Sequence, residues 1–227
     1  MNRRIPLLTA VSILACMVAA APLLAKAVVV RSAGPSAKSY PPGKALPDNA
    51  KIALQPGDSV TVVGPSSARN LRGPGTFPVA SSSAEGLAAA ANRRSRFGAM
   101  RAGELALNPS PWNVDVTQSG TTCATSGAVK LWRPESEGAT KLTITSASGG
   151  AATVDWPAGK STTDWPASLK VAEGAEYKLA LAGGASPESV RFVILPAAPK
   201  DPIEAAQVLV DHGCQNQLDV LVDGLKE

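Results

Sequence analysis

Histidine and cysteine are the residues of this chain that could do nucleophilic or metal chemistry, and they come close together at one point. His212 is the sole histidine, and His212-Gly213-Cys214 places an imidazole two residues from a thiol. A catalytic triad or a metal site would have to be built around this histidine. A cysteine held in a disulfide is neither a nucleophile nor a thiolate ligand, however, so the pattern favours a surface histidine on a helix. We therefore predict no catalytic residue, metal site or cofactor, and a protein that is not an enzyme.

Two Asp-Trp-Pro triplets, Asp155-Trp156-Pro157 and Asp164-Trp165-Pro166, form a second candidate site. The two tryptophans could make a stacking platform for a sugar ring or a peptidoglycan stem, with Asp155 and Asp164 beside them. The pattern favours another interpretation, in which a chain with only 4% aromatic residues uses tryptophan to fill a core. Nothing in the sequence brings the two carboxylates to the separation of a glycosidase pair. Carbohydrate binding, and less so cleavage, is therefore the alternative function.

A basic cluster lies in the alanine-rich stretch 81–103, for which we predict a helix over about 84–97. The cluster consists of Arg93, Arg94, Arg96 and Arg101. These arginines fit a solvated helix end, where they would complement the helix dipole. The other interpretation is a patch for phospholipid headgroups or an acidic partner.

The first 27 residues have the layout of a secretory leader. Two arginines precede an apolar run, and Ala25-Lys26-Ala27 places small residues where a signal peptidase cuts, which predicts a mature start at Val28. An uncleaved membrane anchor is an alternative, because the run is long enough to span a bilayer. Ile13-Leu14-Ala15-Cys16 loosely resembles a lipobox, which would make Cys16 a lipidation site. We expect a periplasmic or exported protein, with membrane contact only through this leader.

Export bears on charge and on cysteine pairing. Removing Arg3, Arg4 and Lys26 from the 22 basic residues leaves 19, against 18 acidic residues, so the mature chain is near neutral. A nucleic-acid partner needs a net basic footprint and is not expected. Cys123 and Cys214 remain as an even pair in an oxidising compartment, and we predict that they form a disulfide.

Residues 28–80 alternate short β-rich runs with Gly and Pro punctuation. The expected strands are 28–31, 51–54, 59–63, 69–71 and 76–79. Ile52 and Leu54 recur at a period of two, as do Val60 and Val62, which predicts one buried face with Lys51, Ser59 and Thr61 on the outside. The segment is expected to be a small β-sandwich or roll.

Part of this segment resembles the FecR-type periplasmic β domain. Gly57-Asp58-Ser59-Val60 and Gly73-Pro74-Gly75 occupy the places of a Gly-Asp-x-Val step and a late Gly-Pro-Gly turn in that group. The resemblance covers about fifty residues and implies an exported β module of signalling or envelope proteins. The chain lacks the N-terminal anti-sigma helices of a FecR regulator, so the resemblance does not extend to the regulatory function.

Residues 111–196 show apolar residues at alternate positions in seven runs, which predicts an antiparallel sandwich of immunoglobulin-like size. The runs are Trp112/Val114/Val116, Val129/Leu131, Leu142/Ile144, Val154/Trp156, Leu169/Val171, Tyr177/Leu179/Leu181 and Val190/Phe192/Ile194. Asp201-Pro202-Ile203-Glu204 is typical of a helix start, and an apolar stripe then recurs at three or four residues, with Gly213 as a possible break.

The expected fold is therefore mainly β with a C-terminal amphipathic helix. Its parts are a signal peptide (1–27), a FecR-like β domain (28–80), an Ala/Arg-rich helical connector (81–110), a β-sandwich (111–198) and a helix packed on that sandwich (199–227). The function expected for this layout is a non-enzymatic interaction or structural module of the periplasm or envelope, with a protein or a glycan as its partner.

Overall fold

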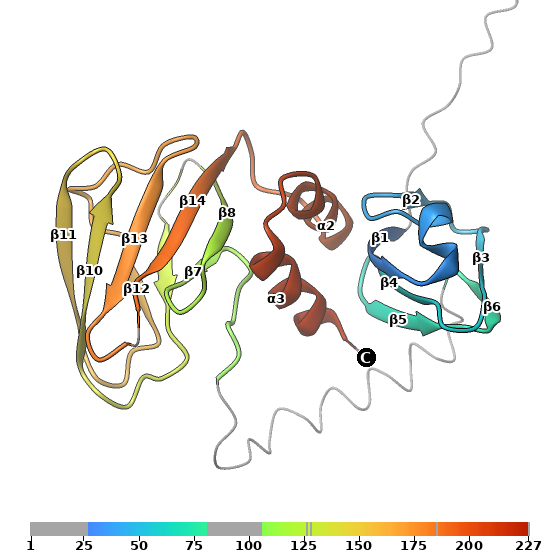
Figure 1. Ribbon diagram of the computed structural model, residues 1–227, viewed down its shortest axis with the longest axis horizontal. Coiled ribbons are helices and arrows are strands. Elements are labelled where there is room, and N and C mark those ends of the chain that lie inside the picture. The colour runs from blue at the N-terminus through green and yellow to red at the C-terminus, as the bar shows by residue number, and fades with distance from the viewer. Residues whose placement is uncertain (1–26, 81–105, 126, 128, 185, 227) are drawn as a thin grey trace, which may run out of the picture.

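The computed structural model describes residues 27–80, 106–125, 127, 129–184 and 186–226, so the predicted leader, most of the connector and its arginine cluster lie outside the described residues. The described chain is mainly β: two β units are separated by a pair of helices (Figure 1).

The N-terminal unit contains two small sheets. Its four-stranded antiparallel sheet has the order β2-β1-β4-β5, and β3 pairs with β6 in a two-stranded sheet. The strands are β1 (Ala27–Ala33), β2 (Ala45–Leu46), β3 (Lys51–Leu54), β4 (Ser59–Val63), β5 (Ala68–Arg72) and β6 (Gly75–Pro78), with a 3-10 turn, η1 (Pro35–Ser39), after β1. The five predicted strands are confirmed, whereas β2 and η1 carry no apolar alternation and were not predicted.

The larger sheet of this unit is buried on both faces. Val29, Val60 and Val62 pack with Ile52 of β3 in a core between the two sheets. On the other face, Val28 and Val30 belong to a different core, which includes the helices. Thr61, predicted to be exposed, is buried because this second face is covered.

The segments Gly57-Asp58-Ser59-Val60 and Gly73-Pro74-Gly75 meet in space at one end of the N-terminal unit. Asp58 is buried and accepts hydrogen bonds from the backbone N–H groups of Ser36 and Gln55. The Gly73 N–H donates to the Asp58 carbonyl at 3.0 Å. A Cβ on Gly73 would lie 2.0 Å from the Gln55 carbonyl oxygen, so only glycine fits there. Both motifs therefore fix turns and strand ends.

The second unit is a sandwich of a five-stranded and a three-stranded sheet. The sheet orders are β11-β10-β13-β14-β8 and β12-β9-β7. The strands are β7 (Asn113–Asp115), β8 (Gly120–Thr125), β9 (Lys130–Trp132), β10 (Thr140–Ser146), β11 (Ala151–Trp156), β12 (Thr162–Asp164), β13 (Glu176–Leu181) and β14 (Glu188–Leu195). Six of the seven predicted runs contain or adjoin a strand.

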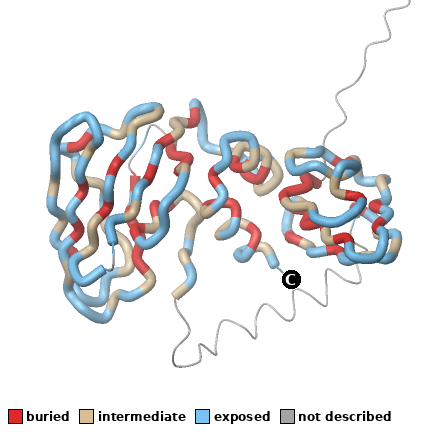
Figure 2. Tube along the Cα trace, in the orientation of Figure 1, coloured by how far each residue is buried: buried red, intermediate tan, exposed pale blue. Residues whose placement is uncertain are grey.

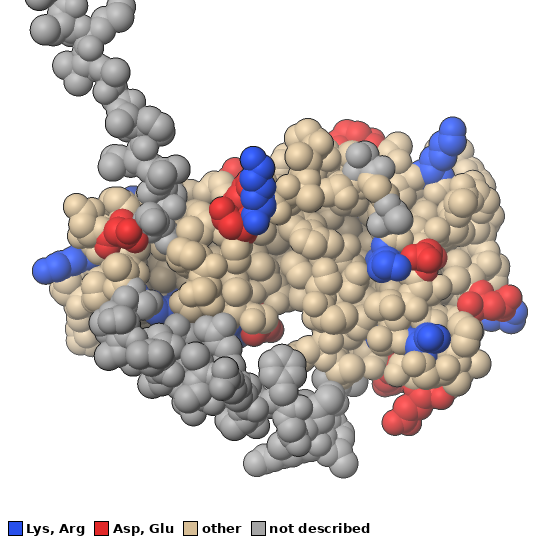
Figure 3. All heavy atoms as spheres, turned by 180° about the vertical axis from the view of Figure 1, so that it is seen from behind, with Lys and Arg blue, Asp and Glu red and all other residues tan. Residues whose placement is uncertain are grey.

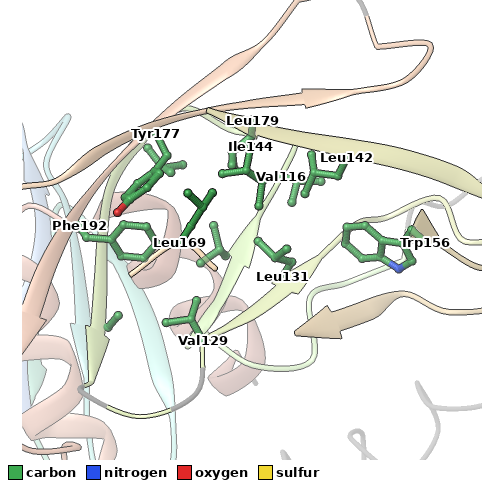
Figure 4. Packing of buried hydrophobic residues seen from close by; sticks show 13 residues of the cluster. Val116, Val129, Leu131, Leu142, Ile144, Trp156, Leu169, Tyr177, Leu179 and Phe192 are labelled. Carbon is green, nitrogen blue, oxygen red and sulfur yellow. The ribbon is translucent and has the colours of Figure 1, made fainter. Parts of the chain in front are cut away.

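The inward residues of these strands fill one core (Figure 4). Leu142 and Ile144 of β10, Leu179 of β13 and Phe192 of β14 are at most 1% exposed, as the period of two predicts. Leu169 joins this core too, although the Leu169–Val171 run is a loop and not the predicted strand.

The sandwich is mixed, where a wholly antiparallel one was predicted. β8 pairs with β14 in parallel, and β7 pairs with β9 in parallel. β8 was not predicted because its inward residues, Thr122 and Ala124, are small or polar and give no apolar alternation.

The C-terminal segment forms two helices, α2 (Pro202–Asp211) and α3 (Gln215–Leu225). Asp201 caps α2 by accepting a hydrogen bond from the Glu204 N–H at 2.9 Å, as its sequence predicts. Gly213 has a φ of +69° and separates the helices, because a helix cannot continue through that conformation.

The two helices form a layer between the β units. α2 contacts β1 and β4, and α3 contacts β8 and β5, so the helical segment packs on the N-terminal unit as well as on the sandwich. Leu209 of α2 and Leu218 and Val222 of α3 are buried in the core that this layer shares with both units. Buried stretches alternate with exposed ones along both helices (Figure 2). Arg31 of β1 also pairs with Asp219 of α3. Neither helix is long and apolar enough to span a membrane, and the described residues contain no other α-helix.

Candidate functional site

Trp156 is a core residue and does not present its ring to a ligand. The side chain is 1% exposed and lies at the end of the sandwich core away from Phe192 and Tyr177 (Figure 4). The guanidinium carbon of Arg133 lies 5.1 Å from the centre of the Trp156 ring. Arg133 is buried as well and donates to the carbonyls of three loop residues: Gly138, Pro157 and Lys160. The stacking platform, which was the less favoured interpretation, does not form at Trp156, because Arg133 and the core occupy its ring.

Trp165 is also used in packing. Its ring makes edge-to-face contacts with Tyr177 and Phe192, with centroids 5.0 and 5.3 Å apart. Its Nε1–H donates to the Leu169 carbonyl at 2.7 Å. Burial raises the pKa of the Tyr177 phenol, whose hydroxyl donates to the Lys170 carbonyl. The preferred interpretation of the tryptophans as packing residues is therefore confirmed, and the two rings form no joint platform.

Asp155 and Asp164 remain on the surface, where each pairs with a lysine of the neighbouring strand. Asp155 of β11 pairs with Lys141 of β10, and Asp164 of β12 pairs with Lys130 of β9 at 2.8 Å. The two carboxylates lie on different sheets. Exposed ion pairs of this kind contribute little stability. Because the two aspartates lie on different sheets, they form no common acidic site.

Cys123 and Cys214 are bonded, which confirms the predicted disulfide. Their Cα atoms are 5.9 Å apart, and neither residue is exposed. Cys214 precedes α3, so the bond fixes the start of this helix to β8. His212 lies exposed at the end of α2, as predicted. Among the described residues, no group of three His, Cys, Asp or Glu side chains could hold a metal.

Gln217 supports the disulfide from the next turn of α3. Its buried side-chain amide accepts a hydrogen bond from the Cys123 N–H and donates to the Cys123 carbonyl at 2.8 Å. It also donates to the Pro111 carbonyl at 2.7 Å. Gln217 therefore takes the place of a neighbouring strand at the β8 edge of the sheet. This role of Gln217 was not predicted, since a sequence does not show which backbone groups a side chain will satisfy.

The open surface that best fits a binding site is the outer face of the five-stranded sheet. Phe192 points into the core, so its neighbour Arg191 points outward, and Lys178 does the same between Tyr177 and Leu179. Strand pairing places Thr145 beside Lys178 and Thr121 beside Arg191. These four side chains form a staggered row across four strands, which we call the outer-face row; Glu176 of β13 lies directly opposite Arg191.

The outer-face row lines a depression of about 440 Å³, together with Glu176 and Ser189. Lys178 and Arg191 are diagonal neighbours on β13 and β14, which places both cations within reach of one ligand group. Neither side chain forms an ion pair with any residue that the structure describes. Beyond the row, the part of this sheet face around Cys123 and Val193 is covered by the helices.

Charge elsewhere is spread in single residues and mixed pairs. The face seen in Figure 3 carries acidic and basic side chains next to each other, with no broad field of one sign. The outer-face row was not predicted, because its residues occupy the polar positions of strands whose register depends on the parallel β8–β14 pairing. The polar alternation of 176/178 and 189/191 is the signal that could have indicated it.

No protein-family model matches this chain, and neither does any curated protein.

Proposed function

We propose that this chain is a non-enzymatic interaction module of the periplasm or cell envelope that binds a partner through the outer-face row. The observation that carries the proposal is the depression on the open sheet face, where Lys178 and Arg191 lie beside the hydroxyls of Thr121 and Thr145 and have no ion-pair partner among the described residues. Hydroxyls and cations suit a partner surface that presents carboxylates and other hydrogen-bond acceptors.

Two further features support the proposal. The Cys123–Cys214 disulfide is compatible with an oxidising location outside the cytoplasm. The helical layer shares one core with both β units, which gives the outer-face row a rigid support. The FecR resemblance agrees with an envelope module. No observation favours the glycan alternative at Trp156 and Trp165, because both rings are engaged in the core.

Charge reversal tests the binding surface. The variant Lys178→Glu/Arg191→Glu should lose a partner that wild-type protein captures from envelope extracts, because both cations of the row change sign. Lys51→Glu, an exposed lysine on β3, is the matched control and should retain the partner. Equal capture by all three proteins would reject the outer-face row as the binding surface.

Intact-mass measurement of the protein recovered from cells tests export. We expect a start at Val28; a lipidated start at Cys16 or a retained Met1 would identify the two alternatives. Ala27 is buried in β1 and pairs with Leu46, so the Ala27–Val28 bond lies inside a strand. Cleavage at this bond should therefore precede folding of the N-terminal unit.

A further inference from the structure

The strand β11 forms an open edge of the five-stranded sheet (Figure 1). It pairs with β10 and with no other described strand. The opposite edge of the same sheet, β8, is closed by the Gln217 amide and the Cys214 disulfide. An open edge presents unpaired backbone donors and acceptors, which are a template for another strand.

The register identifies which backbone groups of β11 point outward. The Ser146 N–H donates to the Gly150 carbonyl, so the hydrogen-bonded pairs of the β10–β11 hairpin continue at Ala152, Val154 and Trp156. Ala151, Thr153 and Asp155 therefore direct their N–H and C=O groups away from the sheet.

β11 lacks the features that usually protect an edge strand. Its six residues contain no proline and no lysine, and its register with β10 has no bulge. Its one charge, Asp155, already pairs with Lys141 of the same chain. Apart from β8, the other edges are shorter: β2, β7 and β12 have two or three residues, β3 and β6 have four, and β5 has five, including two arginines.

We propose that β11 pairs with β11 of a second copy of this chain, in an antiparallel arrangement about a two-fold axis at Thr153. In this register Thr153 faces its own copy, and Ala151 faces Asp155 of the second copy, so all three outward residues of each strand are paired. The two aspartates face alanines and not each other, which avoids like-charge repulsion. The half-buried side chains of Ala152 and Val154 become neighbours across the axis on the core side.

The size of the contact makes the dimer weak and dependent on concentration. A stable interface buries about 800 Å² on each partner, and one pair of six-residue strands buries less. The dimer goes beyond the proposed function and does not rest on it, because the outer-face row plays no part in the strand pairing.

Cysteine cross-linking in the full-length chain tests the register, with Cys16→Ser in every variant to remove the third cysteine. Thr153→Cys should form a reducible dimer under mild oxidation, because Cα atoms of a hydrogen-bonded antiparallel pair lie about 5.5 Å apart, within disulfide reach. Thr143→Cys is the matched control: it is exposed on the same face, next to Thr153, but on the inner strand β10. A mixture of Ala151→Cys and Asp155→Cys should cross-link, whereas each variant alone should not.

Sedimentation equilibrium tests the dimer without cross-linking. Thr153→Pro removes an outward N–H and should raise the dimer dissociation constant at least about tenfold. Thr153→Lys keeps the backbone donor but places like charges on the axis, and it should raise the dissociation constant in the same way. This second variant tests the dimer even if Thr153→Pro fails to fold. A wild-type monomer at millimolar concentration, or equal cross-linking at Thr153→Cys and Thr143→Cys, would overturn the proposal.

Discussion

Asp58 shows how one buried carboxylate can hold two turns. Burial alone would raise its pKa, but hydrogen bonds from the Ser36 side chain and from the Ser36 and Gln55 amides outweigh this and hold the pKa below its usual value of 3.8. A folded-state pKa below the unfolded one stabilises the fold above the unfolded pKa, and this contribution is lost as the pH falls through the folded value.

Asp58→Asn should therefore lower the melting temperature by several degrees at neutral pH, because the new amide nitrogen would oppose a backbone N–H that now finds an acceptor. The difference from wild type should shrink as the pH falls below 3.8, because the carboxyl group is protonated first in the unfolded chain and, at a lower pH, in the folded one. Melting curves from pH 3 to pH 7 measure both effects. Glu135→Gln, an exposed acid of the sandwich unit, should show no such difference, and a gap that stays constant over this pH range would contradict the assignment.

Gln217 is a second buried side chain that holds two parts of the fold together, in this case α3 and β8. Gln217→Leu would leave the Cys123 N–H, the Cys123 carbonyl and the Pro111 carbonyl without their partner in a buried place. The free energy of unfolding should fall by roughly 3 kcal/mol or more in urea titrations, since three groups lose their partner and each buried group left unsatisfied costs about 1–3 kcal/mol. Gln215→Leu, on the exposed side of the same helix turn, should change it by less than about 0.5 kcal/mol. Similar losses for the two variants would reject the bonding role.

At the scale of elements, we predict opposite changes in stability when two glycines near the helices are replaced by alanine. Gly213 adopts a φ of +69°, so Gly213→Ala should destabilise the fold by about 1 kcal/mol through backbone strain alone, because nothing lies within 4 Å of the added Cβ. Gly224 lies inside α3 in equally open space, and Gly224→Ala should stabilise by up to about 1 kcal/mol. Chemical denaturation of the two variants measures the signs, and two changes of the same sign would show that the helix break is not set by Gly213.

The disulfide is the covalent link between helix and sandwich. It joins residues 91 positions apart, for which the chain-entropy model gives on the order of 4 kcal/mol. Cys214→Ser should lower the melting temperature by several degrees, and the double variant Cys123→Ser/Cys214→Ser should lose about as much as the single one, since either change removes the same bond. Quantitative alkylation of Cys123 and Cys214 in the native, unreduced protein would contradict the pairing.

At the scale of the whole molecule, the sequence predicts where the strands lie better than it predicts which elements pack against each other. Ile52 and Leu54, like Phe192 and the alternate residues of its run, predict strand positions correctly, because apolar residues at a period of two indicate a strand with one buried face. The helix α2 packs against β1, which is far from it in the sequence. The amphipathic pattern of a helix shows that one side is covered, but it does not show which surface covers it. The tryptophans show the same limit, because a large aromatic fits a core and a binding site alike until its neighbours are known.

The shared core predicts that the two β units unfold together. Leu209 is fully buried in the core that the helices share with β1 and β8, so Leu209→Ala should cost about 2–5 kcal/mol. Because this core joins both units, amide hydrogen exchange should speed up in β1 and β4 as well as in β8.

Two probes separate the units in one experiment. All four tryptophans lie in 112–165, so their fluorescence reports on the sandwich unit, while hydrogen exchange of peptides from 28–80 reports on the N-terminal unit. Both probes should give the same transition in wild type, and Leu209→Ala should shift both by the same amount. Leu107→Ala is the matched control, since this leucine is 75% exposed and its truncation should shift neither. Two separate transitions, with Leu209→Ala moving only one, would show that the helices belong to one unit and only touch the other.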